Sequence, residues 1–145
     1  MIEINKFKKL LEENGEHLPL LTLDEFFRDN VVEDSIAPNQ WLYGRPSILD
    51  IWGMLNELEK SNKIAWVRVS LHDDTEIEVD DNGEEELFLL GDTIVICTSM
   101  NEDELQDNIN TQWLCADGVI PAEMEGYSNI PQIPEQCSCY EIVWD

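Results

Sequence analysis

Basic residues are scarce in this sequence, and they stop early. Only eight of the 145 residues are Lys or Arg, against 32 Asp and Glu, and none of the eight lies beyond position 68. Most of the affinity of a protein for nucleic acid comes from neutralising phosphates, and anionic membranes repel an acidic surface for the same electrostatic reason. The charge therefore excludes nucleic acid and anionic membranes as direct ligands.

Long apolar runs are also missing. No stretch approaches the ~18 apolar residues of a membrane span, and the first ten residues carry charges that a signal peptide core does not tolerate. We therefore expect a cytoplasmic protein with four reduced thiols. The one close cysteine pair, Cys137 and Cys139, is separated by a single residue instead of the two to four typical of structural zinc sites. The sequence predicts neither a metal nor a cofactor.

Catalytic motifs are absent as well. The chain has no nucleophile elbow, no phosphate-binding glycine loop and no H-E-x-x-H metal motif. Its two histidines are His17 and His72, and only His72 has carboxylates beside it, at Asp73 and Asp74. That small cluster leaves a metal-assisted hydrolase using His72 as an alternative, although such sites need more histidines from elsewhere in the chain. We predict no catalytic residues.

The composition is nevertheless that of a folded protein. Hydrophobic residues make up 43% of the chain and five residues are tryptophan, which is enough apolar material for one sizeable core. We expect a single domain over residues 1–145, helix-rich in 1–62 and sheet-rich and strongly acidic in 63–145. Twenty of the acidic residues lie after position 68.

Helical patterns dominate the first part of the chain. Apolar residues recur at helical spacing over 3–14, and Thr22 with Glu25 forms a capping-box pattern that opens a short helix. The segment 47–63, SILDIWGMLNELEKSNK, has one apolar stripe and begins with Ser47, a good N-cap residue. Further along, Asn101 is placed to cap a short helix over 101–109.

From Lys63 the pattern alternates with the period of a β-strand. Four strands are predicted at 63–71, 75–80, 85–90 and 93–99, with a type I′ turn at Asn82-Gly83 and a second two-residue turn at Gly91-Asp92. Under that register Ile77 faces Phe88, and Phe88 faces Val95. A loop over 118–136 and a last strand over 139–145 complete an α+β fold, in which N-terminal helices pack on a mostly antiparallel β-meander of four to six strands.

One stretch stands out by its charge. Residues 71–90, LHDDTEIEVDDNGEEELFLL, contain nine carboxylates and no Lys or Arg. Like charges on one face of a strand repel each other, and a basic partner would relieve that repulsion on binding. We therefore predict a partner-binding surface formed by Asp73, Asp74, Glu76, Glu78, Asp80, Asp81, Glu84, Glu85 and Glu86.

These observations predict a small acidic binding protein that engages a basic protein. The sharpest form of this hypothesis is an immunity-type inhibitor that blocks the nucleic-acid cleft of a nuclease toxin. In the alternative, the acidity serves only solubility. The functional contact is then the loop at 118–136 or the aromatic segment around Trp41, for which the sequence favours a structural role as a lid over the core.

Overall fold

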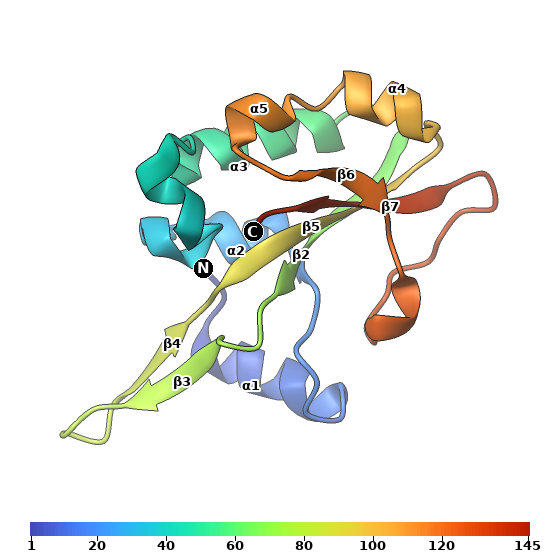
Figure 1. Cartoon of the computed structure of the whole chain (residues 1–145). Helices are drawn as coiled ribbons and strands as arrows, with labels where there is room; N and C mark the ends of the chain where they lie inside the picture. The colour runs from blue at the N-terminus through green and yellow to red at the C-terminus, as the bar shows by residue number, and fades with distance from the viewer.

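The computed structural model describes residues 1–145 and consists of helices with a mostly antiparallel five-stranded sheet and a separate two-stranded sheet (Figure 1). The predicted α+β class is confirmed. The elements are α1 (Ile4–Glu13), β1 (Leu21–Thr22), α2 (Leu23–Phe27), η1 (Glu33–Ser35), η2 (Pro38–Tyr43), α3 (Ile48–Glu59), β2 (Ile64–Leu71), β3 (Glu76–Val79), β4 (Glu85–Phe88), β5 (Gly91–Thr98), α4 (Glu102–Asp107), α5 (Thr111–Leu114), β6 (Gly118–Pro121), η3 (Met124–Gly126) and β7 (Ser138–Val143).

The helices begin where their capping residues predict. Thr22 Oγ1 accepts the backbone N–H of Glu25 at 3.0 Å, and the Glu25 carboxylate accepts the N–H of Thr22 at 2.9 Å, which completes the capping box before α2. Ser47 and Asn101 each accept the backbone N–H three residues further on and open α3 and α4. These helix starts are local properties of the sequence.

The larger sheet has the strand order β1-β2-β5-β7-β6, with β5 in its centre. Alternate residues of β5 enter two different cores. Ile94 and Ile96 belong to the large core that includes α2 and α3, whereas Val95 and Cys97 pack with Trp66 under the segment that follows β6. β5 is therefore covered on both faces, as its apolar sequence predicts.

The predicted adjacency of the four strands between Lys63 and Ser99 is wrong. β2 pairs directly with β5, and β3 pairs only with β4. The N–H of His72 donates to the Leu90 carbonyl at 2.7 Å, so β3 and β4 continue the β2–β5 ribbon outward and project from the body (Figure 1). Gly91 is the first residue of β5, opposite Leu71, and is not part of a turn.

The register within the β3–β4 hairpin also differs from the prediction. Ile77 lies opposite Leu87, and Phe88 lies opposite Glu76. The Asp80 N–H donates to the Glu84 carbonyl at 2.9 Å and the Gly83 N–H to the Asp80 carbonyl at 3.0 Å. Only Gly83 in this turn has a positive φ, of 81°. The loop thus has three residues and not two, and the shift of one residue moves Phe88 to the acidic face.

Several elements, among them β6 and α5, lie where the sequence predicts no regular structure. β6 occupies the start of the predicted loop 118–136 and pairs with β7 at the edge of the sheet. It ends at Pro121, which an edge strand tolerates because the missing N–H faces solvent. The short α5 begins at Asn110, whose side chain accepts the N–H of Trp113 at 3.0 Å. The predicted final strand is confirmed as β7, paired with β5.

Gly91 provides a test of this topology. A Cβ atom at position 91 would lie 3.0 Å from Val69 Cγ1 and 3.2 Å from Phe26 Cζ, both in the core. We expect Gly91→Ala to lower the free energy of unfolding by about 1–3 kcal/mol through overpacking. The matched control is Gly53→Ala in α3, where a Cβ meets nothing within 4 Å; it should stabilise by about 0.5–1 kcal/mol. Denaturant unfolding of both variants checks the pair, and a harmless Gly91→Ala would contradict the packing described.

Candidate functional site: the acidic hairpin

The acidic hairpin, residues 76–88, consists of β3, β4 and the turn between them. Its outer face carries Glu76, Glu78, Glu86 and Phe88, because opposite residues of an antiparallel pair share a face and alternate residues of a strand share one too. Glu78 and Glu86 are directly opposite, and all four side chains are exposed. Three carboxylates and one aromatic ring thus form a continuous surface.

The inner face of the hairpin attaches it to the rest of the molecule. Leu87 is buried in the large core, with Ile77 packed against it. Glu85, on the same face, accepts a hydrogen bond from Lys8 Nζ of α1 at 2.6 Å. Since this contact is an ion pair, Glu85 is balanced by a cation of the protein itself and does not contribute to the outer surface.

The remaining predicted residues lie at the two ends of the hairpin. At the tip, Asp80 Oδ1 accepts the backbone N–H groups of Asn82 and Glu84, both at 2.9 Å, and so holds the turn. At the base, the Asp74 N–H donates to Nδ1 of His72 at 3.0 Å. The nine predicted carboxylates are therefore divided into an outer face with Glu76, Glu78 and Glu86, a tip with Asp80, Asp81 and Glu84, a base with Asp73 and Asp74, and Glu85 on the inner face.

The close approach of carboxyl groups on the outer face raises the pKa of its central residue. The pKa of Glu78 is raised, first because its carboxyl group shares a hydrogen bond with Glu76, then through partial removal from water and repulsion by Glu76 and Glu86. The chain's cations lie elsewhere. Of the six ion pairs made by Lys or Arg, only Lys8–Glu85 involves the hairpin. No Lys or Arg of the chain forms an ion pair with the outer face.

Sites for metal or nucleophilic chemistry do not form around the other candidate residues. His17 and His72 line different pockets, and no three His, Cys, Asp or Glu side chains are arranged to hold a metal ion. Burial raises the pKa of Cys97 to about 12, with Cys139 and Cys137 as further causes. A thiol in that environment stays protonated, whereas metal binding and nucleophilic attack need the thiolate.

The segment around Trp41 has a different role from the predicted lid over the core. The Trp41 ring lies 4.7 Å from the guanidinium carbon of Arg45, which is itself buried and donates from Nη2 to the Glu33 carbonyl at 3.0 Å. Beside it, Leu42 and Tyr43 are 91% and 79% exposed. The ring therefore covers a buried cation, and η2 presents an apolar surface to solvent.

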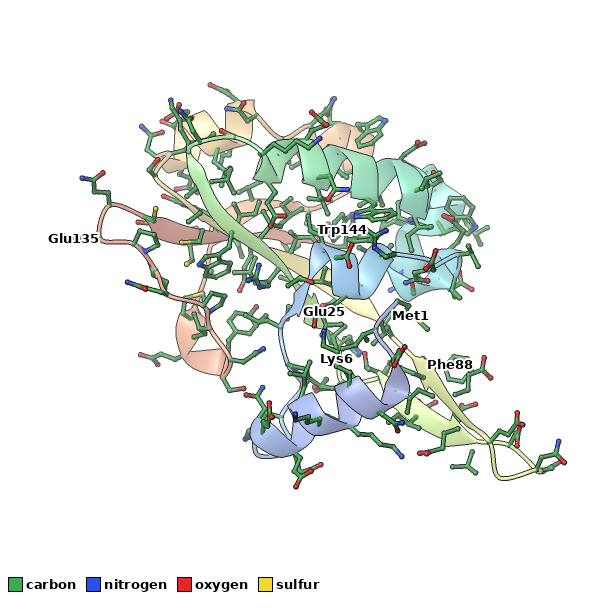
Figure 2. The ribbon with its side chains drawn as sticks, turned by 180° about the vertical axis from the view of Figure 1, so that it is seen from behind. Met1, Lys6, Glu25, Phe88, Glu135 and Trp144 are labelled. Carbon is green, nitrogen blue, oxygen red and sulfur yellow. The ribbon has the colours of Figure 1, made fainter.

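An apolar cleft runs beside β4, and no pattern in the sequence predicts it. Its volume is about 230 Å³, and Figure 2 shows two of its residues, Met1 and Phe88, close together where the hairpin leaves the body. One wall of the cleft is formed by five consecutive residues, Glu85 to Leu89. The other wall comes from segments distant in sequence, which no local pattern could bring together: Met1, Ile4, Asn30, Val32 and Ser35.

The fold and this site define a class: a small α+β protein that presents an acidic β-hairpin with an apolar cleft at its base. The chain belongs to the uncharacterized protein YfbO family, whose model matches residues 2–142. No curated protein and no solved structure matches it. None of its helices has the length and apolar character required to cross a membrane.

Salt should stabilise the isolated protein. Raising the ionic strength from about 10 mM to about 150 mM shortens the Debye length from about 30 Å to about 8 Å, which screens the repulsion among the carboxylates. We expect the melting temperature to rise over this range, measured by circular dichroism. Choline chloride should act like sodium chloride if screening is the cause. A melting temperature that stays flat or falls would contradict the expectation.

The raised pKa of Glu78 predicts a pH-dependent variant effect. A raised pKa means that the folded protein binds the proton of the Glu78 carboxyl group more tightly than the unfolded chain does. Protonation of Glu78 therefore stabilises the fold. This stabilisation is fully present below the pKa of Glu78 in the unfolded chain and is lost as the pH rises through its pKa in the folded protein. Glu78→Gln should therefore raise the melting temperature near pH 7 and leave it nearly unchanged near pH 3, well below the ordinary glutamate pKa, where the wild-type side chain is protonated and as neutral as glutamine. Glu123→Gln, in an exposed loop, is the control. An equal effect at both pH values would refute the assignment.

Proposed function

We propose that this protein is a small acidic binding protein that engages a basic protein partner through the outer face of the acidic hairpin. The observation that carries the proposal is the set of Glu76, Glu78 and Glu86 on one projecting face without a cation from the same chain. A basic partner supplies the missing cations, and it gains long-range attraction from the strongly negative second half of the chain.

The shape of the site supports a partner with a concave basic surface. The hairpin extends away from the body, so its tip and outer face can enter a cleft that a flat acidic surface could not reach (Figure 1). Nuclease toxins have such clefts, because they must neutralise the phosphates of their substrate. An immunity-type inhibitor of a nuclease toxin, acting in the cytoplasm, is therefore the specific form of the function that we propose.

The exposed apolar surface of η2 supports a second candidate contact. Leu42 and Tyr43 are far more exposed than apolar residues of a core. The end of α5, the helix that carries the exposed Trp113, adjoins this segment, since Cys115 Sγ donates to the Tyr43 carbonyl at 3.7 Å. Exposed aromatic residues are enriched at protein interfaces. Binding through this surface would leave the acidity as an aid to solubility and would depend little on salt.

Affinity capture with two charge-matched variants tests the proposal. The site variant is Glu76→Gln/Glu78→Gln/Glu86→Gln. The control is Glu123→Gln/Glu125→Gln/Glu135→Gln, which removes three exposed carboxylates from the segment between β6 and β7. Figure 2 shows Glu135 on the side of the molecule opposite Phe88. Both variants change the net charge equally, so a difference between them reports position and not total charge.

We expect the wild type and the control variant to retain basic proteins at low salt, and the site variant to retain at least tenfold less. Mass spectrometry identifies the eluted proteins, and purified candidates are then tested for inhibition of nuclease activity. Capture should fall steeply between about 50 mM and about 500 mM salt. Equal capture by all three proteins, or capture insensitive to salt, would reject the hairpin and favour the η2 surface.

A further inference from the structure

The outer edge of β4 is unpaired. The Asp80 N–H donates to the Glu84 carbonyl, so residues 80 and 84 form a hydrogen-bonded pair. Hydrogen-bonded and non-hydrogen-bonded pairs alternate along an antiparallel ladder, and the N–H and C=O groups of the second kind point away from the partner strand. In this hairpin those outward groups belong to Glu85 and Leu87 of β4 and, when the alternation is continued one residue past the end of the strand, to Leu89.

Nothing in the molecule satisfies these groups. β4 has β3 as its only neighbour in the two-stranded sheet, and no hydrogen bond outside that ladder involves the backbone of Glu85, Leu87 or Leu89. The three residues span five positions, about 17 Å of strand. An unpaired edge is a template for another strand, and folded proteins usually shorten, cover or twist such edges to avoid pairing with other chains. Leu87 and Leu89 are only 4% and 5% exposed, so an added strand has to reach this edge through the space beside β4.

The apolar cleft lies along this same edge. Residues of both faces of β4 line it in unbroken order from Glu85 to Leu89, and no residue of β3 does. A cavity over one face would be lined by alternate residues only. The cleft is thus the space beside the strand, with Met1, Ile4 and Val32 forming an apolar opposite wall.

We propose that a lysine- or arginine-rich segment of the partner binds by adding a β-strand to the free edge of β4. The inference rests on the proposed function and specifies how the basic partner is held. The open backbone groups supply the hydrogen bonds, and the two faces of the hairpin select the side chains. Basic side chains on one face of the added strand meet Glu86 and its neighbours, and apolar side chains on the other face enter the cleft.

This arrangement requires a particular sequence pattern in the ligand. Successive side chains of a strand point to opposite faces, so the bound segment must alternate basic and apolar residues over about five to seven positions. A segment with the same composition but with its lysines in one block cannot satisfy both faces at once. Binding by charge alone makes no such distinction, because it counts cations and ignores their order.

The test uses synthetic peptides and the intact protein. The first peptide alternates Lys and Val over nine residues; the second contains the same residues with all lysines together. Two further peptides are the alternating one with N-methyl groups on every Val or on every Lys. N-methylation removes the donor N–H and blocks the strand edge. Only one of the two alternating sets of amides can face β4, whichever direction the added strand runs.

We expect the alternating peptide to bind at least tenfold more tightly than the block peptide by calorimetry. One N-methylated peptide should lose at least tenfold in affinity, while the other keeps most of it. Hydrogen exchange by NMR should show slower exchange of the Leu87 and Leu89 amides on binding. Equal affinity of the two N-methylated peptides, or unchanged exchange at these amides, would overturn strand addition.

The outcomes separate this inference from the proposed function. Equal binding of every peptide to the wild type, with loss in the Glu76→Gln/Glu78→Gln/Glu86→Gln variant, rejects strand addition and keeps the acidic face as a binding surface. If no peptide binds but basic proteins are still captured through the outer face, strand addition is likewise rejected and the acidic face is kept as a binding surface. If neither peptides nor basic proteins depend on that face, both proposals are rejected.

Discussion

The structure depends above all on the antiparallel pairing of β2 with β5. Val67 and Val69 of one strand and Ile94 and Ile96 of the other are fully buried, and both cores are built on this ladder. β1 pairs with the second edge of β2, and β7 with the second edge of β5. Because β2 and β5 pair directly with each other, the chain between them pairs with itself as β3 and β4 and leaves the body as a projecting hairpin.

The distribution of charge is consistent with that architecture. Ionised carboxylates cannot enter a core without a large desolvation cost, so a segment with nine of them must remain in water. Four of the eight cations form ion pairs within the first half of the chain, and Lys8 reaches only the inner face of the hairpin. The result is a negative outer face on a projecting hairpin, and the proposed binding of a basic partner depends on this feature.

The candidate site could be predicted only in part from the sequence. The alternation of Glu76, Ile77, Glu78 and Val79 correctly places the two glutamates on one strand face. The assignment of Glu85 to that face was not supported, because Asp80 accepts two backbone N–H groups and stabilises a loop one residue longer than the Asn-Gly pattern predicts. A single residue in a turn decides which face every later side chain occupies.

By itself, the sequence determined the acidity, the class of fold, the starts of α2, α3 and α4 and the approximate position of most strands, because capping, periodicity and charge act over a few neighbouring residues. The tertiary structure decided which strands pair, which carboxylates meet a cation, and where Met1 and Val32 join β4 to form a cleft. These features depend on contacts between segments far apart in the chain. Which of these contacts form depends on the free energy of the whole core, and a local sequence pattern does not report that free energy.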